Sequence, residues 1–300
     1  MTLDEATVSD DPDRIEPLTE EEAHARAKLL PVMEIFGPTF QGEGMLCGKQ
    51  TYFIRFGLCD YKCTMCDSMH AVDPNQVRAN ANWLKQEDIF NTFMDMLDKN
   101  PANQNPAPWI TFTGGNPCIH NLEHLINLFH SQGFLINVEN QGSITPEWLD
   151  LVDLVTISPK SPGMGERFDP EKFSDMLEYL ASSERGPRDG QSVCIKVVVF
   201  AARDLEFADM VFDIVRSKWI DESCCYLSLG NPFPPSSENL ITLNEKVVHE
   251  GKTTVDERIK LNLLDEFRSL CEDILGDKRF RNVTFLPQLH VLTWANKQLV

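Results

Sequence analysis

Long apolar stretches are missing from this sequence of 300 residues. No run reaches the ~18 apolar residues that a membrane-spanning helix needs, so we expect no membrane span. Basic residues are also scarce, with 27 against 46 acidic residues, and the net charge of −19 disfavours direct contact with the phosphates of nucleic acids. The first residues lack the basic and apolar stretch of a secretory signal, which predicts a cytoplasmic protein.

Acidic residues are concentrated at the beginning of the chain. Residues 1–22 carry nine acidic side chains and one basic side chain. Such a composition is typical of a solvated, disordered segment, and a docking arm for a basic partner is the alternative. Because no internal repeat or linker signal is visible, we expect an acidic, disordered tail over residues 1–31 and one domain over residues 32–300.

After this tail, segments typical of strands and of helices alternate. Short apolar runs predict strands at 51–57, 109–113, 134–139, 153–157, 193–200, 225–229 and 282–286. Helices are predicted at 86–98, 120–131, 171–182, 204–217 and 256–275. The stretches 69–85 and 231–255 look like insertions, and we expect surface loops or lids there.

The alternation predicts an α/β fold with a mostly parallel sheet and right-handed crossovers. A doubly wound sheet and a barrel both have this pattern. Polar motifs follow five of the predicted strands, and in parallel folds the loops at the carboxyl ends of strands build the active site. Five such loops around one rim favour a barrel, although the strand count falls short of eight.

Nine cysteines in a chain expected in the cytoplasm indicate free thiols and metal ligands rather than disulfides. Cys59, Cys63 and Cys66 have C-x3-C-x2-C spacing directly after a predicted strand, so one loop can wrap a single metal centre. An iron–sulfur cube normally takes four thiolates, and three leave one iron open to a substrate or cofactor. A zinc site with His70 as the fourth ligand is the alternative.

The three cysteines, together with Tyr61, resemble the cluster loop of the radical S-adenosylmethionine (SAM) enzymes. Further motifs narrow the match. They are EIFGPTFQGEG from Glu34 to Gly44, Cys66-Asp67-Ser68, Thr113-Gly114-Gly115-Asn116-Pro117, Ser158-Pro159-Lys160 and Pro287-Gln288-Leu289-His290. In this order the motifs resemble the 7-carboxy-7-deazaguanine synthase family, from about Val32 to the end of the chain.

This resemblance implies a partial, open β/α barrel of the radical SAM type. It implies conversion of 6-carboxy-5,6,7,8-tetrahydropterin into 7-carboxy-7-deazaguanine with loss of ammonia, a lyase reaction in queuosine-type 7-deazapurine biosynthesis. It further implies a 4Fe-4S cluster, SAM and Mg²⁺ as cofactors, an electron donor of the flavodoxin or ferredoxin type, and a homodimer. A radical SAM activase of a glycyl-radical protein and a zinc-stapled binding module are the alternatives.

The resemblance also implies roles for single residues. The cluster would be bound by Cys59, Cys63 and Cys66, and magnesium by Ser68. SAM would contact Met65, Asp67, Gly114, Gly115, Asn140, Ser158, Lys160 and Asn231. The pterin would contact Phe40, Gln41, Gly42, Glu43, Arg55, Thr113, Gln288 and His290. No firm catalytic acid or base is implied.

Arg55 also has a physical reason to be in a site. It lies in the middle of an apolar strand, where an arginine without a partner is costly. Its guanidinium can bind a substrate carboxylate bidentately. A structural salt bridge with Glu34 or Glu43 is the alternative.

Other roles have structural alternatives as well. Gly114 and Gly115 permit the close approach of a ligand to the backbone, and they equally suit a plain turn between a strand and a helix. Ser68 is alternatively a helix or turn cap. Asn140 and Asn231 are alternatively loop caps.

Overall fold

A computed structural model gives the fold and describes residues 28–100, 106–182, 191–218, 224–235, 237–251 and 253–298. Its centre is a nine-stranded sheet in the order β3-β1-β2-β4-β5-β6-β7-β8-β9. The strands are β1 (Leu30–Phe40), β2 (Gln50–Phe56), β3 (Asn82–Leu84), β4 (Trp109–Gly114), β5 (Leu135–Asn140), β6 (Leu154–Ile157), β7 (Ser192–Val199), β8 (Cys225–Leu229) and β9 (Thr284–Pro287).

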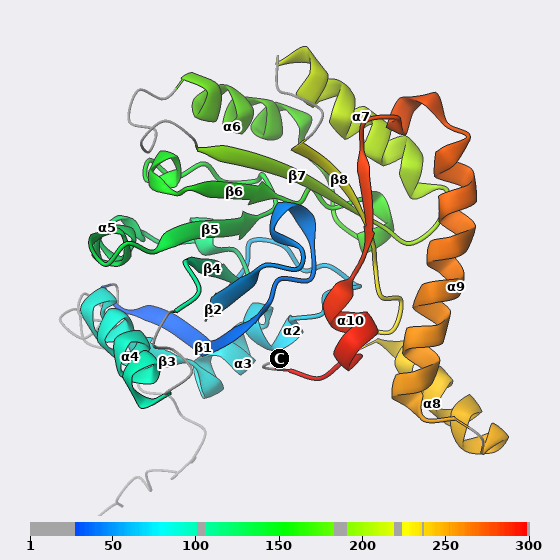
Figure 1. Cartoon of the computed structure of the whole chain (residues 1–300), viewed down its shortest axis with the longest axis horizontal. Coiled ribbons are helices and arrows are strands. Elements are labelled where there is room, and N and C mark those ends of the chain that lie inside the picture. Colours follow the sequence, from blue (N-terminus) through cyan, green and yellow to red (C-terminus); the bar gives the residue numbers. More distant parts are fainter. Residues whose placement is uncertain are drawn as a thin grey trace, which may run out of the picture.

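In the order of the sheet, the seven strands from β2 to β9 each run parallel to their neighbours. The two antiparallel pairs both involve β1, which pairs with β2 and with β3. The edge strands of the sheet are β3 and β9, so the sheet curves without closing on itself (Figure 1). The predicted open β/α barrel is therefore confirmed. The apolar runs that predicted seven strands form the seven parallel strands, with ends that differ by up to two residues.

Five amphipathic helices cover the outer face of the sheet (Figure 1). They are α4 (Gln86–Lys99), α5 (Glu123–Ser131), α6 (Pro170–Ser182), α7 (Asp204–Ser217) and α9 (Val255–Leu275). In α9, for example, Ile259, Leu263, Leu270 and Ile274 are buried in the core at helical spacing. These burials hold the outer layer against the strands, and all five helices were predicted.

Two segments that were expected to be surface loops contain regular structure. Residues 69–85 form α2 (Met69–Val72), α3 (Pro74–Asn80) and β3, and residues 231–255 contain α8 (Glu238–Glu250). Asp73 caps α3, because its carboxylate accepts hydrogen bonds from the backbone N–H groups of Asn75 and Gln76. A last short helix, α10 (Leu289–Trp294), follows β9.

The acidic tail predicted for residues 1–31 falls mostly outside the described residues, which begin at Lys28. The domain itself starts slightly earlier than residue 32, since β1 begins at Leu30 and pairs with β3 from that residue on. Within the described ranges, every helix is too short or too polar to cross a membrane.

Candidate active site

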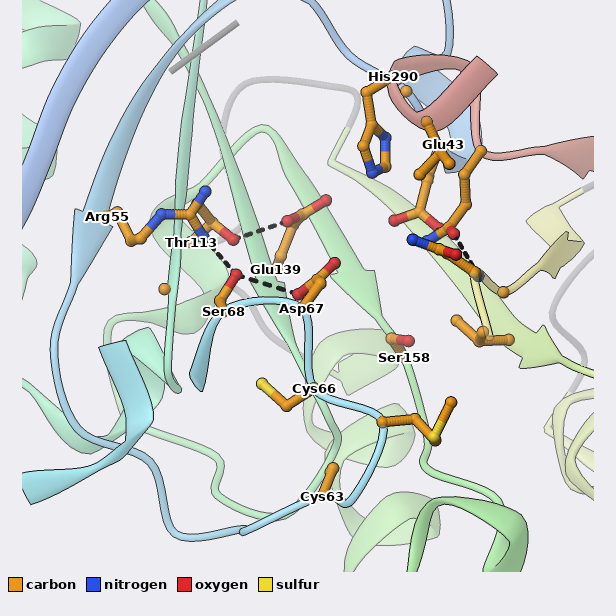
Figure 2. A pocket seen from close by; sticks show the side chains of 18 of the residues that line it. Glu43, Arg55, Cys63, Cys66, Asp67, Ser68, Thr113, Glu139, Ser158 and His290 are labelled. Atoms are coloured by element: carbon orange, nitrogen blue, oxygen red, sulfur yellow. Dashed lines mark hydrogen bonds between the residues drawn. The ribbon is translucent and has the colours of Figure 1, made fainter. Parts of the chain in front are cut away.

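A single pocket at the carboxyl ends of the parallel strands collects the predicted site residues. Its lining includes Phe40, Gln41, Gly42, Glu43, Arg55, Cys59, Cys63, Met65, Cys66, Asp67, Ser68, Thr113, Gly114, Gly115, Asn140, Ser158, Lys160, Asn231, Gln288 and His290. Figure 2 shows Cys63 and Cys66 at one end and Glu43 and His290 at the other. The motifs are spread over some 250 residues of sequence, and the barrel rim brings them together.

The three cysteines of the C-x3-C-x2-C loop are free thiols. Cys63 is buried, and Cys59 and Cys66 are half-buried. Burial raises the pKa of Cys63 to about 11 and that of Cys66 to about 12, whereas the cation of Lys160 acts in the opposite direction on both. The thiols are therefore neutral at physiological pH unless a metal replaces their protons.

The geometry does not support the zinc alternative. His70, its proposed fourth ligand, lies with Nε2 3.3 Å from Oε1 of Glu34. Across the described ranges, no three side chains of His, Cys, Asp or Glu are grouped closely enough to hold one metal ion. A single zinc ion requires such convergence. An iron–sulfur cube has a separate iron for each thiol, so its ligands can stand further apart.

Gly114 and Gly115 lie against the beginning of the cysteine loop. A Cβ atom on Gly115 would stand 1.8 Å from the carbonyl oxygen of Leu58, and one on Gly114 would stand 1.9 Å from that of Phe56. The N–H of Gly115 donates to Phe56 O over 3.0 Å, and the N–H of Asn116 donates to Leu58 O over 2.8 Å. Both glycines are thus required by the close backbone contact that fixes the cysteine loop.

Arg55 is held by two side chains of the pocket wall. Its Nε donates to Oε2 of Glu34 over 2.7 Å, and its Nη1 donates to the hydroxyl of Ser68 over 2.9 Å. Ser68 in turn donates to Oδ1 of Asp67 over 3.0 Å (Figure 2). Glu34 is one of the two salt-bridge partners that the sequence suggested. Ser68 is the N-cap residue of α2, but its hydroxyl bonds Arg55 and Asp67 rather than the helix.

Glu43 is anchored in the barrel interior by three strands or strand ends. Lys196 of β7 lies 2.8 Å from its Oε2, while Ser228 of β8 and Gln288 after β9 donate to its Oε1 over 2.8 and 3.1 Å. Burial alone would raise the pKa of Glu43, but the cation and the hydrogen bond of Lys196 hold it well below its usual range. The loop after β1 therefore crosses the interior and joins both sides of the open sheet.

Gln41 fixes the loop after β1 through its own backbone neighbours and through Glu139 of β5. Its side-chain oxygen accepts from the N–H groups of Gly42 and Glu43, and its Nε2 donates to Oε1 of Glu139 over 3.2 Å. The other oxygen of Glu139 accepts from the hydroxyl of Thr113 over 2.8 Å. Each oxygen of Glu139 therefore keeps one lone pair for a further donor in the pocket, and Nζ of Lys196 lies 3.9 Å from Oε1.

The helix α10 closes the open side of the barrel over this loop. The N–H of Leu289 donates to the carbonyl of Gly42 over 3.0 Å. The ring of His290 lies so near that a Cβ atom on Gly42 would stand 2.2 Å from its Nδ1. Glycine at position 42 is therefore what allows His290 to lie directly over the loop.

The two predicted amide contacts to SAM are engaged within the protein. Asn140 accepts from the N–H of Gly142 over 2.8 Å, and Asn231 accepts from that of Phe233 over 2.9 Å. Both side chains thus serve as the loop caps that were the alternative reading. Ser158 is buried and accepts from Nζ of Lys160 over 3.1 Å, so these two form one polar corner of the pocket.

Six charged or titratable residues of the pocket lie outside the predicted set of cluster, cofactor and substrate contacts, and of these only His70 had been considered as a ligand, in the zinc alternative. They are Glu34, Tyr61, His70, Glu139, Lys196 and Lys297. Lys196 interrupts the apolar run of β7, as Arg55 interrupts that of β2, so the same argument would have found it. Glu34 stands within a quoted motif and Glu139 directly precedes Asn140, but neither has a spacing signal of its own.

The fold and site define a class of protein: an open β/α barrel with a three-cysteine loop at its carboxyl rim. Sequence comparisons make this more specific. The 7-carboxy-7-deazaguanine synthase of Bacillus subtilis is 33% identical over 273 residues, which cover 91% of this chain and 99% of the relative. The 7-carboxy-7-deazaguanine synthase of Bacillus cereus is 31% identical over 270 residues, or 90% and 98%. No family model matches the sequence.

The structure of QueE from Escherichia coli has the same fold. It aligns with a TM-score of 0.56 at 22% identity, and the match covers 87% of this chain and 95% of that one. Given the identity and coverage of the Bacillus relatives, the chain belongs to the 7-carboxy-7-deazaguanine synthase family. It is therefore an enzyme of the radical SAM class, and its membership of the synthase family argues against both alternatives, the radical SAM activase and the zinc-stapled binding module.

Proposed function

We propose that this enzyme converts 6-carboxy-5,6,7,8-tetrahydropterin into 7-carboxy-7-deazaguanine with loss of ammonia, as a step of queuosine-type 7-deazapurine biosynthesis. One observation carries the proposal beyond family membership. The same pocket contains a free three-cysteine loop and, facing it, an arginine and a carboxylate suited to the two ends of a carboxylated pterin. A protein that only carried electrons would not need an arginine and a carboxylate that face its cysteine loop.

Cys59, Cys63 and Cys66 would hold a 4Fe-4S cluster. The donor set fits, because three free thiols on one loop open into the pocket and leave room for a ligand on the fourth iron. When bound, the cluster and SAM supply the radical that removes a hydrogen atom from the pterin. Lys160 and Ser158 form the polar corner that would bind the SAM carboxylate, and Met65, Asp67, Gly114 and Gly115 would line its site.

Arg55 would bind the pterin carboxylate, and Glu139 would read the amino-pyrimidinone edge. Glu43 was expected to contact the pterin, but its carboxylate already accepts three hydrogen bonds from the protein. Glu139 retains free lone pairs and is held in place by Gln41 and Thr113. Phe40, Gly42, Gln288 and His290 would shape the wall around the ring.

Ser68 would be the protein ligand of Mg²⁺. Its hydroxyl donates its proton to Asp67 and accepts from Arg55, which leaves one lone pair of Oγ for a cation. Magnesium prefers hard oxygen ligands and keeps several waters, so substrate oxygens and water would complete its shell. The hydrogen bond from Arg55 to Ser68 supports a magnesium site that neighbours the carboxylate site.

The compartment, the oligomeric state and the electron donor are proposed from the family resemblance. We propose a cytoplasmic homodimer that receives electrons from a flavodoxin or ferredoxin type of protein. The substrate is a free small molecule, and the net charge of −19 makes a nucleic acid an unfavourable partner.

An anaerobic turnover assay tests the function. The protein is reconstituted with iron and sulfide and mixed with SAM, magnesium, a low-potential reductant and 6-carboxytetrahydropterin. We expect 7-carboxy-7-deazaguanine by mass spectrometry, and no product from Cys63→Ala. Cys271→Ala is the matched control, because Cys271 is a half-buried cysteine of α9 outside the pocket lining.

Two results would contradict the proposal in different ways. Formation of 5′-deoxyadenosine without 7-carboxy-7-deazaguanine would keep the radical chemistry and refute the substrate. Product formation by Cys63→Ala at the rate of the unchanged protein would refute the assignment of the cysteine loop.

A further inference from the structure

A one-residue irregularity in β1 decides where Glu34 points. Val32 pairs with Phe56 of β2, and the register then shifts so that Glu34 pairs with Arg55. If the pairing of Val32 continued without this shift, Glu34 would lie opposite Ile54, which is completely buried in the apolar core. A bulge of one residue moves a side chain to the other face of a sheet. Here it transfers a carboxylate from the core face to the pocket.

At that position Glu34 controls the orientation of Arg55. The ion pair joins Nε of Arg55 to Oε2 of Glu34 over 2.7 Å, and both side chains are largely buried, at 17% and 15% exposure. Ser68 accepts from Nη1. Within the described residues these contacts use two of the five N–H groups of the guanidinium. Those that remain belong to Nη1 and Nη2, at the end that faces the pocket.

We propose that Glu34 is a positioning residue that fixes Arg55 for end-on binding of the substrate carboxylate. The inference rests on the proposed function, because it takes the ligand of Arg55 to be that carboxylate. Arginine can bind a carboxylate side-on through Nε and Nη2 or end-on through Nη1 and Nη2. Glu34 occupies Nε and so removes the side-on geometry. Nε2 of His70 lies 3.3 Å from the other oxygen of Glu34.

A merely structural ion pair would behave differently. Loss of such an ion pair would destabilise the sheet edge and weaken the binding of every ligand of the pocket to the same extent. A positioning residue acts only on ligands that Arg55 holds, so its loss should discriminate between a pterin with a carboxylate and one without. It should also have no further effect once Arg55 is gone, because additivity fails for residues that act through one another.

Equilibrium binding to the reconstituted enzyme tests this, with SAM and magnesium present and no reductant. The probes are 6-carboxypterin and pterin, which lacks the carboxylate, and binding is followed by their own fluorescence. We expect Glu34→Ala to weaken the binding of 6-carboxypterin about tenfold or more, as for loss of a hydrogen bond to a charged group. The affinity for pterin should stay nearly unchanged. Glu34→Gln keeps an oxygen for Nε and should restore part of the affinity.

The double variant Glu34→Ala/Arg55→Ala should bind 6-carboxypterin as Arg55→Ala does. Glu87→Ala is the matched control, since Glu87 forms an exposed ion pair with His124 on the outside of the barrel. Equal weakening of both pterins by Glu34→Ala, or a loss that persists without Arg55, would overturn the positioning role alone. If the unchanged enzyme binds neither pterin, the proposed function fails and this inference fails with it.

Discussion

Single buried charges hold the interior of this barrel together, and Lys196 is the central one. It lies 2.8 Å from Glu43 and 3.9 Å from Glu139, with 7% of its side chain exposed. Removing one partner of a buried pair leaves an uncompensated charge. We therefore expect Lys196→Met to lower the free energy of unfolding by about 3–5 kcal/mol. Glu43→Gln/Lys196→Met should recover part of this loss, as urea unfolding would show.

The pH dependence of the same pair has a defined sign. Burial alone would raise the pKa of Glu43, but Lys196 depresses it, so its contribution is present above about pH 4.3 and is lost as the pH falls. Burial alone would lower the pKa of Lys196, but Glu43 and Glu139 raise it, so its contribution is complete below about pH 10.4 and is lost at higher pH. The double variant should show a flatter stability profile outside this window. An equally steep profile would contradict the account.

At the scale of elements, the turn after β4 and the cysteine loop after β2 depend on each other. A methyl group on Gly115 would meet the backbone of Leu58, at 1.8 Å from its oxygen, and backbone cannot give way as a side chain can. We expect Gly115→Ala to displace the cysteine loop, so that reconstituted protein loses most of its iron while the rest of the barrel stays folded. Iron content and visible absorbance measure the loss, and circular dichroism measures the fold.

Gly276→Ala is the control for that variant. Gly276 lies at the end of α9, and the nearest atoms to an added Cβ are 3.9 Å away. This variant should bind iron as the unchanged protein does. Normal iron binding by Gly115→Ala would mean that the two loops are not coupled.

Elements also show what the sequence could and could not predict. The parallel strands were predictable because strands buried on both faces are continuous apolar runs. β1 was missed because Glu34, Gly37 and Pro38 interrupt its pattern, and β3 was missed because three residues carry no period. α8 was missed within a stretch rich in Pro, Ser and Asn, where its two buried residues, Leu243 and Val247, give a weak stripe.

The same limit applies to the pocket. The sequence identified residues that stand in motifs, such as Cys63, and a charge that interrupts an apolar strand, Arg55, and the structure has them in one cavity. For Arg55 the sequence offered two salt-bridge partners, Glu34 and Glu43, but it could not choose between them, because the choice depends on register. The bulge that turns Glu34 toward Arg55 is a single-residue event in β1, and the contact between Glu43 and Lys196 joins residues 153 positions apart. No local pattern encodes either of them.

For the molecule as a whole, the excess of acidic residues disfavours contact with a nucleic acid. Binding to a phosphate backbone is driven mainly by basic residues that release counterions, and this chain has 46 acidic residues against 27 basic ones. We expect labelled transfer RNA to migrate unchanged in the presence of the reconstituted enzyme, even at low salt where such binding is strongest. A basic protein of similar size serves as the positive control. Retardation that weakens with added salt would show a basic surface that outweighs the net charge, and would move the proposed substrate from a free pterin toward an RNA-bound one.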